Sequence, residues 1–354
     1  MKMSTIKRRE TELDILRLMA TLAVVLTHVC AGQIKILNIL DIDWQILNCF
    51  RAAVTWDVPV FVMISGGMFL NPQKELSLKV LYGKYIKKLV IAFAFWSAIF
   101  QVYYTSYAIY TNSLSLNWKG VLSEYLIGPY PFWYLFMLAG VYAIIPFLKK
   151  IITDKKLTEY FLVLFFAFQI MLCYGQDLPG IGHTIKSILD KIDFTFAIGF
   201  VGYFVLGYYL KAYDISKKAE YALYALGIIL VPLCCYVTTK QSIINMEYTE
   251  TFSRYLMPNI IIESAAIYTF FVKRVSKIKF SERTVKMFTR LTEYGFGVYL
   301  VHALINELIG LTGWTAVTIS PFISVPLLTI VVYGVSLLVT VVIRKIPFVG
   351  KNIT

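Results

Sequence analysis

Charged residues are scarce in this chain. Lys, Arg, Asp and Glu make up 16% of its 354 residues, whereas hydrophobic residues make up 58%. This balance, with a positive mean hydropathy, excludes an ordinary soluble domain. The polar gaps between the apolar stretches are also too short to hold a soluble domain. We therefore expect residues 1–354 to form a single integral-membrane domain.

The alternating pattern of a membrane barrel is missing too. Outer-membrane barrels need segments of about ten residues in which polar and apolar side chains alternate. Here, windows of about twenty apolar residues recur, each long enough to cross a hydrocarbon core of ~30 Å. A backbone in lipid must satisfy its own hydrogen bonds, which a helix does. The sequence predicts an all-α polytopic membrane protein with about ten transmembrane helices. They lie at 13–31, 50–70, 86–110, 129–148, 158–174, 193–211, 219–239, 254–272, 289–310 and 322–343.

Acidic residues are outnumbered by basic ones, and the net charge is +13. Most lysines and arginines fall at the N-terminus, in alternate gaps between spans, or in the C-terminal tail. This distribution follows the positive-inside rule and places both termini in the cytoplasm. Membrane topology thus explains the excess of basic over acidic residues, and we expect no nucleic-acid partner. The first span is long and contains charges, which is typical of a signal anchor rather than a cleaved signal peptide.

Cysteine and histidine are also few, at five and three residues. The cysteines show no metal-ligand spacing, so we expect free thiols and no metal site. Cys30 and Cys49 lie toward the same predicted outer face, and their pairing is left open because sequence does not fix their distance.

Two ionisable residues stand in the first predicted span, which reads RLMATLAVVLTH from Arg17 to His28. Such residues usually face a bundle interior or a watery cavity, because a charge in hydrocarbon costs at least ~2.5 kcal/mol. Steps of three and four residues put Asp14, Arg17, Thr21, Val24 and His28 on one helix face. Arg17 and His28 are about 16 Å apart along the axis. An arginine near the cytoplasm can hold a phosphate, and a deeper histidine can exchange a proton. The alternative is a snorkelling arginine and a buried, hydrogen-bonded histidine.

The second span contains two further candidates. Asp57 lies at a depth comparable to that of His28 and could orient and stabilise its imidazole. Ser65 begins a Ser-Gly-Gly run toward the cytoplasmic end, where small residues permit close helix packing or a ligand near the backbone.

The third span begins with a group of lysines. Lys84, Lys87 and Lys88 stand about level with Arg17 at the predicted cytoplasmic end. They are either phosphate ligands or an ordinary basic flank of a transmembrane helix.

Three later residues also stand out. Trp133, in the run GPYPFWYLF, marks an outer membrane interface or the lip of a cavity. Glu263, near the middle of the eighth span, needs a partner or water. His302, in the ninth span, is either a second base or a partner in an interhelical hydrogen bond.

Taken together, these stretches resemble the acyltransferase 3 family of ten-helix membrane enzymes over essentially the whole chain. The likeness lies in ELDILRLMATLAVVLTH with Arg17 and His28, VPVFVMISGGMFL, PFWYLFMLAGVYAIIP and EYGFGVYLVH. The third span departs from the family pattern, which often has arginines followed by a proline, whereas this chain has lysines followed by Val90.

The resemblance implies transfer of an acyl group, usually acetyl from acetyl-CoA, to a hydroxyl of an envelope carbohydrate or a related lipid-linked acceptor. No cofactor is expected to stay bound; the partners are acyl-CoA, the acceptor and the lipids of a bacterial inner membrane. His28 is the expected general base, assisted by Asp57. The other expected site residues are Arg17, Lys84, Lys87, Lys88 and Ser65 for acyl-CoA, and Trp133, Glu263 and His302 for the acceptor. The competing interpretations are a polysaccharide exporter and a noncatalytic scaffold, and a homo-oligomer is left open.

Overall fold

Helices are the only regular elements in the part of the chain that the structure describes. A computed structural model describes residues 10–111, 118–175, 181–189, 199–347 and 350–354. The longer helices are α1 (Thr11–Ile34), α2 (Ile42–Val54), α3 (Asp57–Phe69), α5 (Lys87–Tyr110), α6 (Trp118–Ile127), α7 (Trp133–Ala143), α9 (Lys155–Tyr174), α10 (Gly182–Leu189), α11 (Phe200–Ala212), α12 (Lys217–Asn245), α13 (Pro258–Lys273), α14 (Glu282–Gly310) and α15 (Pro321–Arg344). The shorter ones are α4 (Leu78–Val80), the π-helical turn η1 (Leu81–Ile86), η2 (Tyr130–Phe132), α8 (Ile145–Ile151), η4 (Thr251–Ser253), η5 (Val275–Lys277) and α16 (Gly350–Ile353).

Seven helical stretches among the described residues are long and apolar enough to span a membrane, or eight if the bent pair formed by α6 with η2 and α7 counts as one span. The predicted all-α, multi-pass membrane fold is confirmed. The number of ten spans stays a prediction. Two predicted spans are not among these stretches. The span at 193–211 begins among residues that the structure does not describe. The other span lies in α14, whose mean hydropathy is lowered by the polar residues Glu293, His302, Asn306 and Glu307.

Two predicted spans are broken by prolines. The predicted span 50–70 divides at Thr55 and Trp56 into α2 and α3. Pro59 lies in the first turn of α3, where its missing N–H costs nothing; in a continuous helix that N–H would have bonded the carbonyl of Thr55. The same happens within 129–148, where α8 begins with Pro146 in its first turn. The break before Asp57 turns this side chain inward.

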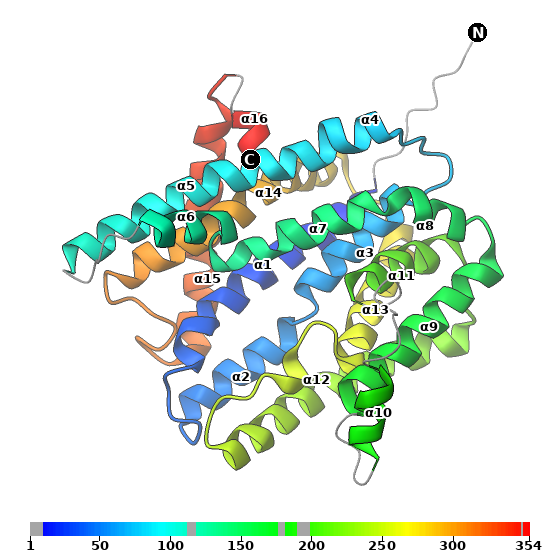
Figure 1. Ribbon diagram of the computed structural model, residues 1–354, viewed down its shortest axis with the longest axis horizontal. Coiled ribbons are helices and arrows are strands. Elements are labelled where there is room, and N and C mark those ends of the chain that lie inside the picture. The colour runs from blue at the N-terminus through cyan, green and yellow to red at the C-terminus, as the bar shows by residue number, and fades with distance from the viewer. Residues whose placement is uncertain (1–9, 112–117, 176–180, 190–198, 348–349) are drawn as a thin grey trace.

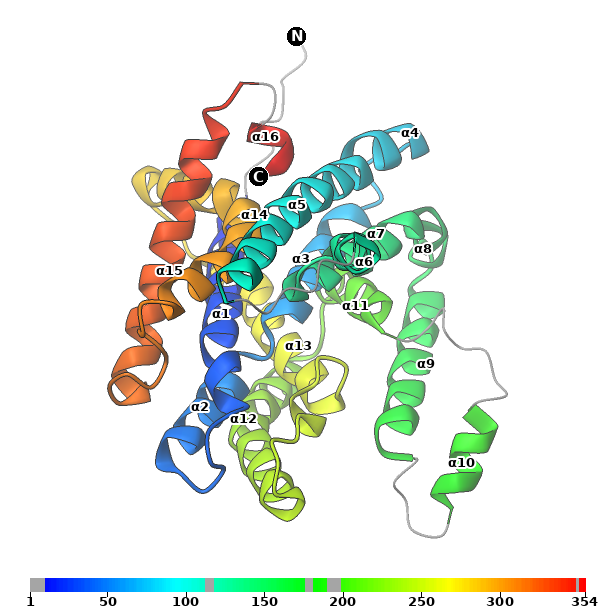
Figure 2. The ribbon, with the colours of Figure 1, turned by 60° about the vertical axis from the view of Figure 1, so that its left-hand side comes forward.

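The helix α1 crosses the middle of the bundle. Figure 1 shows it running between the layer of α5, α6 and α7 and the helices α2, α3 and α13, and its neighbours include α14, α15, α2 and α3. Figure 2 shows α9 and α10 on one side of the molecule and α14 and α15 on the other. Residues on α1 can therefore face cavities inside the bundle.

Glycines permit the closest helix contact, between α3 and α11. A Cβ atom on Gly66 would lie 1.8 Å from the carbonyl oxygen of Phe204, and one on Gly207 would lie 2.1 Å from that of Met63. The two backbones therefore touch at these points, as small residues allow in membrane bundles. Close helix packing explains Gly66.

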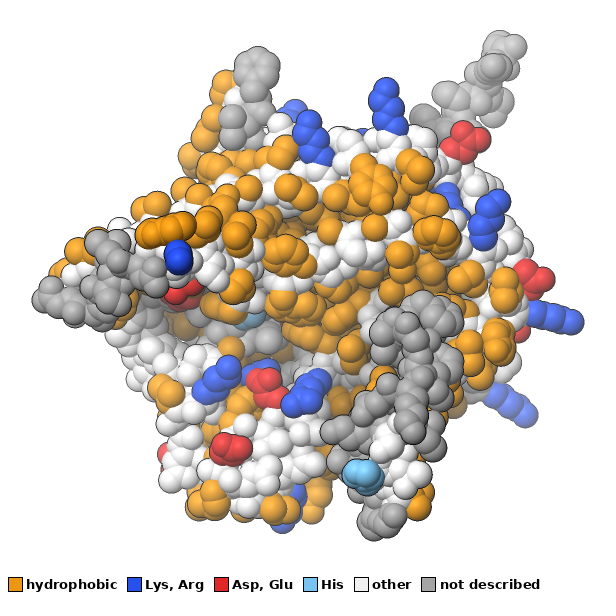
Figure 3. Space-filling view, viewed as in Figure 1, with side chains coloured by type: hydrophobic (Ala, Val, Ile, Leu, Met, Phe, Trp, Pro, Cys, Tyr) orange, Lys and Arg blue, Asp and Glu red, His pale blue; other side chains and the backbone are white. Residues whose placement is uncertain are grey.

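The surface has a broad apolar band. Figure 3 shows hydrophobic side chains across α5, α6 and α7, with lysine and arginine side chains above them and a hollow in the face below. Exposed apolar residues on these helices include Val90, Ile99, Val102 and Phe136. An apolar surface of this extent fits contact with lipid.

The five cysteines are free thiols in the structure. Cys30 is buried on α1, whereas the sulfur of Cys49 lies 2.8 Å from that of Cys235 on α12. The neighbour of Cys49 is therefore Cys235 and not Cys30.

Candidate functional site

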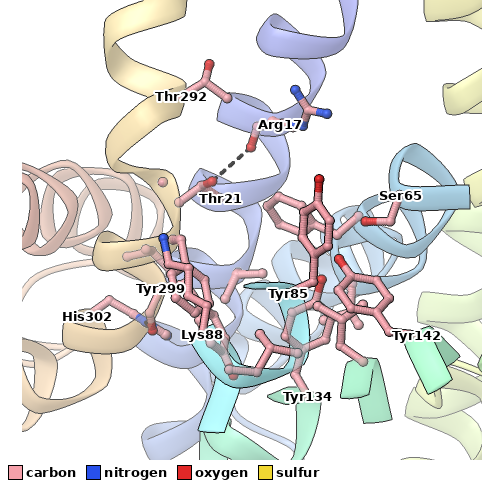
Figure 4. A pocket seen from close by; sticks show the side chains of 18 of the residues that line it. Arg17, Thr21, Ser65, Tyr85, Lys88, Tyr134, Tyr142, Thr292, Tyr299 and His302 are labelled. Carbon is pink, nitrogen blue, oxygen red and sulfur yellow. Dashed lines mark hydrogen bonds between the residues drawn. The ribbon is translucent and has the colours of Figure 1, made fainter. Parts of the chain in front are cut away.

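A cavity of about 470 Å³ lies beside α1. Its walls come from α1, α3, the turn η1 with the start of α5, α7 and α14. Figure 4 shows Tyr85, Tyr134 and Tyr142 on one side of it, and Tyr299 with His302 on the other. The cavity therefore joins helices that are far apart in the sequence.

One face of α1 lines this cavity. Arg17, Thr21, Val24 and Val25 contribute to the wall. Arg17, Thr21 and Val24 belong to the face that the sequence predicted, whereas Asp14 and His28 of that face are not among the residues that line this cavity. The hydroxyl of Thr21 donates to the carbonyl of Arg17 at 2.9 Å, shown dashed in Figure 4, and so leaves no free donor there.

The guanidinium of Arg17 is held near the start of the cavity. Its Nη1 donates to the Asp14 carboxylate at 2.9 Å, and its Nη2 contacts the sulfur of Met68. The Arg17 side chain remains 25% exposed, so part of its donor set still faces the cavity. A guanidinium ordered in this way suits an anionic group such as a phosphate.

Two of the three predicted lysines join Arg17. Lys84 and Lys88 line the cavity, and the Nζ of Lys88 donates to the carbonyl of Thr354 at 2.8 Å. Lys87 is exposed and does not line it. Lys84, Tyr85 and Lys88 share one face around the π-helical turn η1, a type of turn often found at functional sites. The wall of the cavity therefore contains three cationic groups.

The imidazole of His302 lies at another part of the wall. Its Nδ1 is 2.6 Å from the carbonyl oxygen of Tyr299, one turn earlier on α14. Because a carbonyl only accepts hydrogen bonds, Nδ1 holds the proton and Nε2 has the lone pair. His302 is fully buried, and its Nε2 has no hydrogen-bond partner among the described residues. This nitrogen is therefore an acceptor without a donor.

His28 lies next to His302. The two ring centroids are 4.9 Å apart, and the ring of His28 is 5.2 Å from that of Tyr130. Asn306 donates to the backbone carbonyl of His28 at 3.4 Å, which ties this part of α1 to α14. His28 is partly exposed, whereas His302 is buried. The structure thus brings together the two histidines that the sequence selected.

Asp57 is fully buried, with its carboxylate directed at a neighbour of His28. Its Oδ2 accepts from the hydroxyl of Thr27 at 2.9 Å, and its Oδ1 accepts from the backbone N–H of Val58 at 2.6 Å. The phenol of Tyr255 lies beside the same carboxylate. The recorded hydrogen bonds therefore connect Asp57 to Thr27, the residue before His28.

The remaining predicted residues are spread out. Ser65 lines the cavity near Tyr142. Trp133 stacks against Phe200 at 5.5 Å and lies outside the cavity lining. Glu263 is 1% exposed in the contact between α12 and α13, also outside that lining. The acceptor-binding roles of Trp133 and Glu263 stay predictions.

Sequence reasoning missed the tyrosines of the cavity. Tyr85, Tyr134, Tyr142 and Tyr299 all line it. The chain has 25 tyrosines, and those of a membrane interface look the same in a sequence as those of a cavity. The one available signal was the three-residue spacing from Tyr299 to His302, which places both on one helix face.

A comparison with known families agrees with this geometry. A family model described as an acyltransferase domain matches residues 10–345. The chain belongs to the acyltransferase 3 family. No curated protein and no solved structure matches it. This acyltransferase 3 protein is therefore a membrane acyltransferase, and the matched range includes every helix of the cavity.

Proposed function

We propose that this acyltransferase moves an acyl group, most simply acetyl, from acyl-CoA to a hydroxyl of an envelope carbohydrate or a related lipid-linked acceptor. One observation supports this above all: a single cavity is lined by the cationic side chains of Arg17, Lys84 and Lys88 and by His302, which lies next to His28. A donor with an anionic head and a thioester at the end of a long arm fits that distribution of charge.

On the donor side, Arg17 and the two lysines bind the phosphates of acyl-CoA through charge-assisted hydrogen bonds. Ser65 and the hydroxyls of Tyr85 and Tyr134 lie in the cavity wall and can bond the polar groups of the pantetheine arm. The two ends of the site are about 16 Å apart along α1, which an extended arm can bridge. Lys87 lies outside the lining and adds to the positive potential at the mouth.

The two histidines carry out the proton transfer in this proposal. His28 removes the proton of the acceptor hydroxyl as its oxygen attacks the thioester carbonyl; the new C–O bond forms, the C–S bond breaks, and the CoA thiolate takes the proton back from His28. General-base catalysis of this kind contributes typically ~10²–10⁴-fold. The Nε2 of His302 has no partner among the described residues, and in this proposal the N–H of His28 turns toward it during the reaction, which leaves the other His28 nitrogen free to act as the base.

The acyl donor comes from the cytoplasm in this proposal, and the protein lies in a bacterial cell membrane. Basic residues concentrate on the side where α1 begins, which fits a cytoplasmic N-terminus. Arg17 then faces the compartment that supplies acyl-CoA, and His28 lies deeper toward the opposite side.

The test is an assay of purified protein with labelled acetyl-CoA and isolated envelope material. Replacing His28 by Ala should reduce transfer by ~10² or more, because the general base is lost. His183→Ala is the matched control, since His183 is exposed and lies on α10, whereas His28 lies on α1 and His302 on α14. Full turnover by the His28 variant would reject this assignment. An acceptor of unchanged mass whose export stops without the protein would instead support a transporter.

A further inference from the structure

A second cavity lies on the other side of Tyr130 from the histidines. Its volume is about 560 Å³, and it is enclosed by α5, α6 and the turn from Gly128 to Tyr130. Tyr130 lines this cavity and also contacts the ring of His28 at 5.2 Å. Figures 1 and 2 both show α5 and α6 side by side. The two cavities therefore approach the histidine pair separately, one through His302 and the other through Tyr130.

The turn that places Tyr130 depends on Gly128. Gly128 has φ of +77°, and a Cβ atom there would lie 2.5 Å from Phe93 and 3.1 Å from the hydroxyl of Ser97. Only glycine fits this position without strain. The carbonyl of Pro131 accepts from the hydroxyl of Tyr299, which ties the turn to α14 one helical turn before His302. The second cavity is thus built into the same framework as the histidines.

The wall of the second cavity offers weakly engaged hydrogen-bonding groups. Gln101 donates to Glu124 and to Thr105, each at the long distance of 3.3 Å, and Tyr104 donates to Glu307 at 3.1 Å. Bonds this long are easily exchanged for bonds to a ligand.

The clearest sign of a missing ligand is Ser97. Its side chain is 1% exposed and lines the cavity, and its hydroxyl has no hydrogen-bond partner within the described ranges. A buried polar atom without a partner is unfavourable, and a hydroxyl-bearing ligand would supply that partner.

The two cavities differ in charge. Arg17, Lys84 and Lys88 line the first, with no carboxylate in its described wall. Glu124 is the charged residue of the second, and neither lysine nor arginine appears among its described lining residues. An anionic group would therefore lose its water in the second cavity without gaining a cation, and would be repelled by Glu124. Phe100 and Tyr130 add aromatic surface, on which the apolar face of a sugar ring can pack.

We propose that the second cavity binds the acyl acceptor, and that it selects an uncharged or amino-bearing sugar unit over an acidic one. This inference rests on the proposed transfer reaction. It goes beyond that reaction by naming the place where the acceptor binds and the charge that the acceptor has. The acceptor hydroxyl passes beside Tyr130 to His28, which takes its proton while the acyl carbon leaves the CoA sulfur for the hydroxyl oxygen.

The experiment compares variants in cells whose envelope is labelled with acetyl groups. Ser97→Trp fills the cavity and Glu124→Lys reverses its charge, so each should lower the label by about tenfold or more. Ser123→Trp is the matched control, because Ser123 is exposed on α6 and does not line the cavity. Each purified variant should still bind acetyl-CoA as the wild type does, which shows that it is folded and that its first cavity is intact.

Two results would overturn the inference. One is normal labelling in both cavity variants. The other is mass spectrometry of the digested envelope that finds the acetyl group on an acidic sugar unit in the wild type. Failure of the proposed function looks different, because no envelope fraction would then contain label that depends on His28.

Discussion

His302 and Tyr299 lie one turn apart on α14, and the Nδ1 of His302 donates to the carbonyl of Tyr299 at 2.6 Å. This bond fixes the proton on one nitrogen and leaves the other, buried and without a partner among the described residues, as an acceptor beside His28. In the proposed mechanism this acceptor orients His28 in the way that a carboxylate orients a catalytic histidine. We therefore propose that the two histidines act together.

Substitutions of His302 should distinguish a role in orienting His28 from a role in binding acetyl-CoA. His302→Leu should lower kcat by about 10–10²-fold with little change in the KM for acetyl-CoA, because His28 loses the acceptor that fixes its proton. His302→Gln should retain more activity, since its amide oxygen can accept the same hydrogen bond. Steady-state kinetics of both variants measure this. Equal losses in the two variants would show that His302 only fills space.

Arg17 should act through the phosphates of the donor. Arg17→Ala should raise the KM for acetyl-CoA by about tenfold or more, because a charge-assisted hydrogen bond is worth ~1.5–3 kcal/mol. The same substitution should have little effect with acetyl-pantetheine, which lacks the nucleotide phosphates. Lys88→Ala should behave like Arg17→Ala, and Lys87→Ala, outside the lining, is the control. A loss as large with acetyl-pantetheine would place Arg17 in a structural role.

Gly66 should tolerate no side chain. The Cβ of Gly66→Ala would lie 1.8 Å from the carbonyl oxygen of Phe204, so α3 and α11 must separate. Overpacking typically costs ~1–3 kcal/mol, and more where both contacts are backbone. Thermal unfolding in detergent should show a clearly lower Tm. Gly140→Ala is the matched control, because a Cβ there meets open space in α7 and alanine favours the helix by up to ~1 kcal/mol.

Cys49 and Cys235 should form a disulfide under mild oxidation. Their sulfurs lie 2.8 Å apart, closer than unbonded sulfur atoms normally pack, and a small movement brings them to bonding distance. Peptide mapping without reduction should find these two residues linked and Cys30 free. Cys49→Ser should abolish the link. A Cys30–Cys49 peptide would contradict the arrangement of α1, α2 and α12.

Helical periodicity explains which parts of the site were predictable. Arg17, Thr21 and Val24 follow the repeat of a helix, so a common face could be read from the sequence, and the cavity lies on that face. Depth in the membrane could likewise be estimated, and it placed Asp57 level with His28. The depth of a residue in the membrane does not say in which direction its side chain points around the helix axis, however. Adjacent residues on a helix point about 100° apart. The carboxylate of Asp57 therefore meets Thr27 while the imidazole of His28 meets His302.

Contacts between segments that are distant in the chain could not be predicted from the sequence. The second cavity depends on the packing of α6 beside α5 and on the turn after α6, which needs Gly128 and brings Tyr130 into the wall. Nothing in the local pattern of Gln101 or Glu124 distinguishes them from polar residues at a helix end. The sequence also could not exclude Lys87, because it does not show which face of this helix meets the cavity. In the structure that face has Lys84 and Lys88.

The contact between Asp57 and Thr27 leads to the last prediction. If Asp57 positions α1 through Thr27, then Thr27→Val should lower kcat nearly as much as Asp57→Leu, because each removes one partner of the same buried hydrogen bond. The double variant should then be little worse than either single one, since coupled residues are not additive. A direct action of Asp57 on the His28 imidazole predicts the opposite: Thr27→Val would be nearly harmless and Asp57→Leu severe. Initial rates of the three variants with labelled acetyl-CoA decide between the two, and acetyl-CoA binding reports on their folding.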